Sequence, residues 1–191
     1  GSRIQDQDVK DLKEFFHVFC WSPIPDGMSD RTRRLYETLN ALAETLLGWI
    51  DDHSPAEVAA QYPTPLRGMI DGSQRTVFRI LHYPPLDETV DPSAVRANAH
   101  EDINLITLLP AGTAPGLQVK DATGAWVDVA CDPSNIIVNS GDMLQEASGG
   151  YFRSTTHRVV NPVGEARATS RYSMPLFLHP RPEVRLSERY T

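Results

Sequence analysis

Residues 99–105 have the sequence AHEDINL, which places His100 and Asp102 two positions apart. In a β-strand, alternate side chains point to the same face, so this imidazole and this carboxylate project together. Residues 154–160, STTHRVV, form a second strand-like run with His157 in its middle. If the two strands lie close together, the three side chains complete a two-histidine, one-carboxylate facial triad, which leaves coordination positions open and suits non-haem Fe(II).

Each of these motifs is a weak signal when it is taken alone. A His-x-Asp tripeptide also fits a simple hydrogen bond or a surface pair, and a histidine among threonines and valines is often a satisfied core residue. Arg171 and Ser173 add context, because they too share one face of an expected strand. A guanidinium and a hydroxyl there fit a carboxylate clamp, with the arginine binding in bidentate fashion. Arg167 is the alternative clamp, although it follows an expected turn.

The composition is that of an acidic chain with ordinary hydrophobicity. Its 191 residues predict a single domain, and its hydrophobic fraction of 40% is typical of soluble globular proteins. The net charge of −7 disfavours nucleic acid or an anionic membrane as a partner. Two cysteines without a CxxC motif, and no visible signal peptide, favour a reducing cytoplasm.

The first third of the chain has helical patterns. An amphipathic helix is predicted over residues 30–52, because apolar side chains recur at steps of four and three residues. These side chains, which should form one buried face, are Leu35, Leu39, Leu42, Leu46 and Trp49. Residues 8–18 also begin with helical spacing, with a strand as the alternative for their aromatic end. A short helix is expected after Ser54-Pro55. The helical portion therefore covers about residues 8–62.

Short β-type runs separated by turns fill the rest of the chain. The expected strands cover residues 76–83, 99–109, 117–120, 125–129, 135–139, 154–160 and 171–178, and the third and fourth form a hairpin. This order predicts a mainly β fold with flanking helices, a sandwich or jelly roll, whose core spans about residues 75–180 of one domain over 1–191.

Four motifs in this order resemble one family: HED (100–102), GDMLQ (141–145), STTHRVVNP (154–162) and RYSMPLF (171–177). Together they are similar to bacterial members of the isopenicillin N synthase-like branch of the Fe(II)/2-oxoglutarate-dependent oxygenases. The resemblance implies a double-stranded β-helix (cupin-like jelly roll) fold, and it implies that terminal segments carried by relatives are missing here. The site residues that it implies are the iron ligands His100, Asp102 and His157, the cosubstrate carboxylate binders Arg171, Ser173 and Tyr83, and the substrate-pocket residues Gln145 and Phe152. It also implies that GDMLQ is a strand bordering that pocket.

The same resemblance implies hydroxylation or desaturation of a small molecule, with 2-oxoglutarate converted to succinate and carbon dioxide. Dioxygen is the other partner, ascorbate a possible reductant, and a monomer the expected state. Two alternatives stay open: an isopenicillin N synthase-like iron oxidase that uses no 2-oxoglutarate, and a non-catalytic jelly roll that binds a metal or ligand. One departure is Leu81, where plant relatives place an asparagine.

Overall fold

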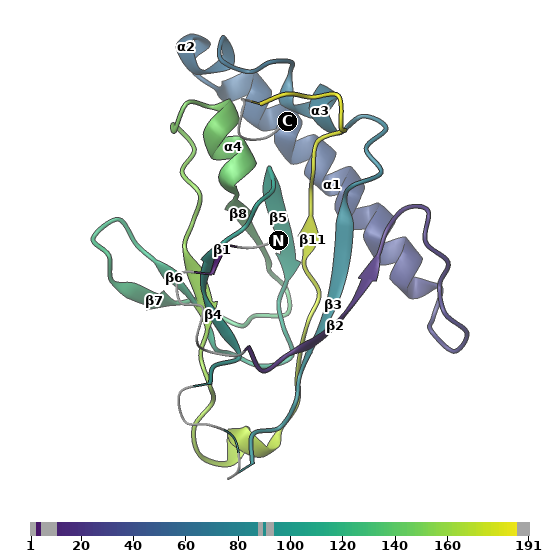
Figure 1. Cartoon of the computed structure of the whole chain (residues 1–191), viewed down its shortest axis with the longest axis vertical. Coiled ribbons are helices and arrows are strands. Elements are labelled where there is room, and N and C mark those ends of the chain that lie inside the picture. Colours follow the sequence, from purple (N-terminus) through teal and green to yellow (C-terminus); the bar gives the residue numbers. More distant parts are fainter. Residues whose placement is uncertain (1–2, 5–10, 88–89, 91–93, 187–191) are drawn as a thin grey trace.

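The computed structural model describes residues 3–4, 11–87, 90 and 94–186 (Figure 1). Short strands make up most of it, and one long helix stands out. The described elements are, in chain order, β1 (Arg3–Ile4), β2 (Glu14–Val18), α1 (Arg31–His53), α2 (Ala56–Ala59), α3 (Leu66–Ile70), β3 (Val77–Tyr83), β4 (Ala97–Glu101), β5 (Ile106–Pro110), β6 (Leu117–Lys120), β7 (Trp126–Asp128), β8 (Ile136–Ser140), α4 (Asp142–Ala147), β9 (His157–Val159), a 3-10 turn (Gly164–Ala168), β10 (Arg171–Ser173) and β11 (Leu176–Phe177).

The described strands form two sheets. One has the order β1-β4-β9-β6-β7, and the other has the order β10-β3-β11-β5-β8 with β2 paired to the outer edge of β3. Every pairing between named strands is antiparallel. Side chains from both sheets line one shared cavity, so the sheets enclose an interior in the manner of a jelly roll.

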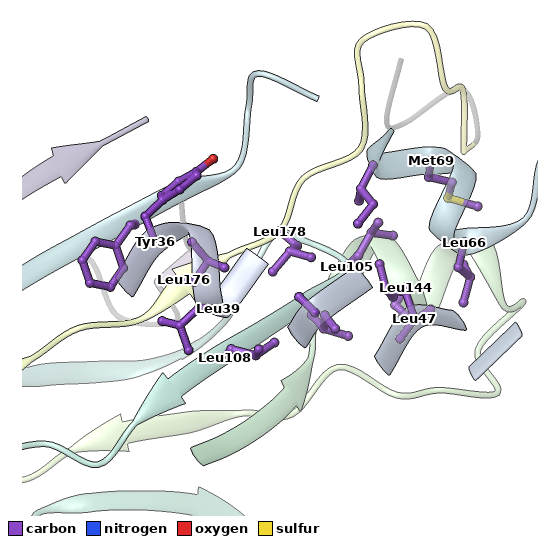
Figure 2. Close-up of a cluster of buried hydrophobic side chains, with 14 of the residues drawn as sticks. Tyr36, Leu39, Leu47, Leu66, Met69, Leu105, Leu108, Leu144, Leu176 and Leu178 are labelled. Atoms are coloured by element: carbon purple, nitrogen blue, oxygen red, sulfur yellow. The ribbon is translucent and has the colours of Figure 1, made fainter. Parts of the chain in front are cut away.

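Strand β3 shows why the sequence produces two layers of packing. Its alternate side chains point to opposite faces of the sheet. Phe78 and Ile80 face the helices: Phe78 belongs to the large hydrophobic cluster that Figure 2 shows, and Ile80 packs against that cluster. Leu81 and Tyr83 face the jelly-roll interior and belong to a smaller cluster built from both sheets. The helical layer therefore closes the outer face of this sheet, and the inner face stays available for a site.

Helix α1 packs with a slightly different face from the one predicted. Its most buried side chains include Tyr36, Leu39, Ala43 and Leu47, whereas Trp49 is 57% exposed. The apolar stripe is wider than one row of side chains, and contacts with α3, β5 and β11 select the row centred on Ala43. No described helix combines the length and the apolar character that a membrane crossing needs.

Several expected elements differ in the structure. The aromatic end of the first segment in the expected helical portion forms strand β2 over 14–18, the alternative that the sequence left open, because its residues pair along the edge of β3. The expected strand over 99–109 is two strands in different sheets, β4 and β5. The last expected strand is likewise divided into β10 and β11. The GDMLQ motif, interpreted as a strand, begins helix α4 instead.

Gly141 explains the local course of the chain beside the break between β4 and β5. A Cβ atom at this position would collide with Asn104 Oδ1 and would lie 2.7 Å from the Asp102 carbonyl oxygen. The neighbouring amide N–H of Asp142 donates to that same carbonyl at 2.8 Å. Glycine therefore lets the start of α4 approach the Asp102 backbone closely and hold it in place.

Candidate active site

Three potential metal ligands converge inside the jelly roll. His100 on β4 and His157 on β9 are direct partners across the antiparallel pair, and their ring centroids lie 4.3 Å apart. Asp102 lies just past the end of β4, with its Oδ1 3.9 Å from His100 Nε2 and 3.8 Å from His157 Nε2. One ligand atom from each side chain lies within 4.8 Å of the others. Cross-strand pairing thus assembles a two-histidine, one-carboxylate donor set that fits Fe(II).

Backbone carbonyls orient both imidazoles. His100 Nδ1 donates to the Asn98 carbonyl at 2.6 Å, and His157 Nδ1 donates to the Thr155 carbonyl at 2.9 Å. Because a carbonyl can only accept, each Nδ1 carries the proton and each Nε2 presents its lone pair to the centre. Burial, followed by the neighbouring His157, lowers the pKa of His100 to about 4. His100 is therefore neutral near pH 7, as a metal ligand must be.

Asp102 is held by two hydrogen bonds that leave one oxygen for the centre. Thr107 Oγ1 donates to Asp102 Oδ2 at 2.7 Å, and Asn139 Nδ2 donates to the same atom at 3.1 Å. Burial alone would raise the pKa of Asp102, but the nearby His157 and these two hydrogen bonds outweigh it and lower the pKa. The carboxylate therefore stays ionised, with Oδ1 directed toward the histidines.

Replacing Asn139 by alanine tests this support of the carboxylate. We expect metal affinity to fall by about 10- to 100-fold, because loss of a group that orients a ligand typically has an effect of that size. Titration of the metal-free protein with Mn(II) measures the change. Asn135→Ala, in the exposed turn before β8, is the matched control and should bind Mn(II) like the unaltered protein. Equal affinities for the two variants would show that Asn139 does not support the site.

Arg171 and Ser173 lie in the same cavity as the three ligands. Both are buried, on one face of β10, and Arg171 pairs across the sheet with Tyr83. Arg171 Nε donates to the Ala114 carbonyl at 2.9 Å, whereas its buried Nη1 has no hydrogen-bond partner within the described chain. An unpaired buried donor of a charged group is costly unless a ligand satisfies it. This end of the cavity therefore fits an incoming carboxylate.

Tyr83 lies beside that guanidinium: the centroid of its ring is 5.2 Å from the guanidinium carbon of Arg171. Burial raises the pKa of Tyr83 above its usual value. Its hydroxyl is therefore protonated at neutral pH and can donate a hydrogen bond into the cavity that it lines. The residues predicted to hold a cosubstrate carboxylate thus lie together, although their role stays a prediction.

Three other candidates lie elsewhere. The Nη2 of Arg167 donates to the Asp87 carbonyl at 3.3 Å. Gln145, on α4, uses its Oε1 to accept the backbone N–H of Ser154 at 2.8 Å. Phe152 packs against the helical core and lines an exposed groove beside α1. None of these three lines the cavity of the metal ligands within the described ranges, and a substrate contact by Gln145 or Phe152 stays a prediction.

Two cationic side chains near the triad were missed by sequence reasoning. Arg79 and Lys13 both line the cavity of the three ligands. The alternation of β3 was a usable signal for Arg79, because this residue is four positions before Tyr83 and shares its face. Nothing comparable pointed to Lys13, which precedes β2 and reaches the cavity only through the tertiary fold.

Comparison with known proteins places the chain in a family. The profile of the 2OG-Fe(II) oxygenase superfamily matches residues 74–180. A 2-oxoglutarate-dependent dioxygenase of Gibberella zeae is 36% identical over 159 residues, which are 81% of this chain and 46% of that protein. The chain thus spans less than half the length of this curated relative.

Solved structures agree with this match. A candidate oxygenase from Shewanella oneidensis is 56% identical, with a TM-score of 0.86 over 96% of this chain and 68% of that chain. A Neurospora crassa protein in complex with alpha-KG and thymine is 26% identical, with a TM-score of 0.73 over 90% of this chain and 55% of that one. These likenesses confirm the jelly-roll core. The chain belongs to the 2OG-Fe(II) oxygenase superfamily.

Proposed function

We propose that the protein is an Fe(II)/2-oxoglutarate-dependent oxygenase that hydroxylates or desaturates a small molecule. One observation carries the proposal: a complete ligand triad and a buried guanidinium with an unpaired nitrogen, Arg171 Nη1, line the same interior cavity. The first fits the metal and the second fits the far carboxylate of the cosubstrate. When bound, Fe(II) supplies the redox chemistry that couples decarboxylation of 2-oxoglutarate to oxidation of the substrate.

The chain contributes binding and orientation to this chemistry. Two neutral imidazoles and one carboxylate leave a bound divalent cation with net positive charge, which favours a chelating keto acid. Arg171 then pairs with the remote carboxylate, and the hydroxyls of Ser173 and Tyr83 are positioned to donate to it. These contacts fix the cosubstrate on one side of the centre and reduce the entropy lost in reaching a reactive geometry.

Apolar walls keep water away from the centre. The cavity is lined by aliphatic side chains from both sheets, namely Leu81, Ala97, Leu109, Leu117, Val119, Ile137 and Val159. Exclusion of water strengthens each charged contact inside the cavity and limits side reactions of an oxidising site. The second cluster of the hydrophobic core therefore also forms the lining of the proposed site.

A small-molecule substrate is supported by three observations. The chain carries a net charge of −7, which offers no general attraction to a polyanionic polymer. The candidate site is a cavity between sheets rather than an open track. The Neurospora crassa relative binds thymine, a small molecule, together with alpha-KG.

A screen of succinate release tests the proposal. The protein with Fe(II), ascorbate and 2-oxoglutarate is incubated with a metabolite library, with a peptide library and with oligonucleotides in separate arms. We expect at least one small molecule to stimulate succinate release. Stimulation confined to peptides or oligonucleotides would contradict the substrate class. Failure of every arm, together with no binding of 2-oxoglutarate to the metal-loaded protein, would favour the non-catalytic alternative.

A further inference from the structure

A second cavity adjoins the metal ligands and shares part of its lining with the first. Five of the described residues line both cavities, namely Lys13, Arg79, His100, Asp102 and Phe177, whereas Arg171 and Ser173 line only the first. The second cavity has a volume of about 250 Å³. Arg79 and Tyr83, the latter paired across the sheet with Arg171, are four positions apart on β3, which corresponds to about 13 Å along a strand. Arg171 thus lies in the first cavity alone, whereas Arg79 lies where the two cavities meet, well separated from Arg171 along the sheet.

The lining of this second cavity is cationic. Lys13, Arg75 and Arg79 contribute positive charges, and Asp102 is the one carboxylate among its lining residues. The Nζ of Lys13 lies 2.6 Å from Asp11 Oδ2, so its charge is balanced within the protein. Arg75 is exposed at the rim. Arg79 is half-buried, and within the described residues no carboxylate lies within ion-pair distance of it.

The surroundings of Arg79 hold its guanidinium in a fixed position. Its Nε donates to His17 Nε2 at 2.7 Å. Its guanidinium carbon lies 4.8 Å from the ring centroid of Phe15 and 5.0 Å from that of Phe177. The single described hydrogen bond uses Nε, so the two terminal nitrogens remain for a planar, bidentate acceptor such as a carboxylate. Aromatic faces on either side restrict the guanidinium without neutralising its charge.

An aromatic row extends from this position along β2 and into the segment that follows it. Phe15 and His17 are stacked with ring centroids 4.9 Å apart, and Phe19 and Trp21 are stacked at the same distance. His17 and Phe19 line the second cavity together with Phe177. A ligand with an anionic end and a flat or apolar body would satisfy both the free cation and this π-surface.

We propose that this cavity receives the primary substrate, and that the substrate is a small carboxylic acid whose carboxylate pairs with Arg79. The inference rests on the proposed oxygenase function and adds the substrate class. One unpaired guanidinium in a partly apolar pocket matches one negative charge, whereas a more highly charged phosphate would be costlier to desolvate. Arg171 serves the cosubstrate, and Arg79 determines specificity for the substrate.

Paired probes test this inference on the protein loaded with Mn(II) and 2-oxoglutarate in the absence of oxygen. The probes are 3-phenylpropionate, cinnamate and hexanoate, each compared with its uncharged primary amide by calorimetric titration. We expect at least one acid to bind at least tenfold more tightly than its amide. Arg79→Gln should remove that preference, Arg79→Lys should keep part of it, and 2-oxoglutarate affinity should change less than threefold in both variants.

Arg158→Gln is the matched control. Arg158 also donates through Nε to a side chain, Gln118, and lies 4.1 Å from the ring of Trp126, but it does not line the second cavity. It should keep the preference for acids. The inference is wrong if no acid binds or if the amides bind as tightly as the acids. It is also wrong if Arg79→Gln keeps the preference for acids, or if that variant weakens 2-oxoglutarate binding as much as it weakens acid binding. Acid preference without 2-oxoglutarate binding would overturn the oxygenase proposal and leave the role of Arg79 standing.

Discussion

Replacing Asp102 by alanine is expected to abolish metal-dependent turnover and to lower metal affinity by more than about 100-fold. Changes in groups that merely orient a ligand already cost about 10- to 100-fold, and this change removes the one anionic ligand of the triad. Succinate release with Fe(II) and 2-oxoglutarate measures the first effect, and Mn(II) titration measures the second. Full activity in this variant would refute the assignment of the triad.

Two further variants separate chemistry from folding. Asp102→Asn keeps an oxygen that accepts from Thr107 and Asn139, so it should fold with little change in its thermal midpoint while still losing metal affinity. Asp128→Ala removes an exposed carboxylate on β7 and should leave turnover unchanged. If Asp102→Asn retained metal affinity, the carboxylate would be structural rather than a ligand.

Replacing Arg171 by alanine should weaken 2-oxoglutarate binding at least tenfold while metal affinity persists. Loss of one partner from a buried charge pair costs about 2–5 kcal/mol, and about 1.4 kcal/mol corresponds to tenfold in affinity. Calorimetric titration of 2-oxoglutarate into the Mn(II)-loaded protein measures the change.

Arg167→Ala is the matched control for that change. Arg167 was the alternative clamp, but its side chain reaches the Asp87 carbonyl instead of the cavity. The Arg167→Ala variant should therefore bind 2-oxoglutarate with the same affinity as the unaltered protein. If Arg167→Ala weakened binding and Arg171→Ala did not, the clamp would have been assigned to the wrong arginine.

The metal ligands could be identified from sequence because their signal is local. The spacing of His100 and Asp102 and the β-type run around His157 suffice, once the two strands are assumed to pair. The direct register of His100 with His157 supplies that pairing. Arg171 and Ser173 follow from the same alternation, because they are two residues apart on one strand.

The supporting residues could not be identified in this way. Thr107 and Asn139 reach Asp102 because β5 and β8 pair in one particular register, in which these two residues are direct partners. Strand register depends on tertiary packing, and no local pattern in either segment reveals it. The cavity position of Lys13 was missed for the same reason, since it depends on how β2 joins the sheet.

The errors in secondary structure also have physical causes. In GDMLQ, the apolar pair Met143-Leu144 fits either a buried strand or one turn of a helix, and so short a run does not distinguish them. The close approach that Gly141 permits then favours the helix start. For α1, hydrophobicity alone did not show which row of side chains along the helix is buried, because the exposed Trp49 is also an apolar residue.

Stoichiometry of oxygen use is the most direct test of the central claim. Once a stimulating substrate is found, oxygen consumed, carbon dioxide released and succinate formed are measured in the same reaction, with and without 2-oxoglutarate. The proposed function predicts that oxygen consumed, carbon dioxide released and succinate formed are equal in amount when 2-oxoglutarate is present. It predicts no substrate oxidation when 2-oxoglutarate is omitted. Substrate oxidation with unchanged oxygen uptake in its absence would contradict the claim and favour the iron oxidase that needs no cosubstrate.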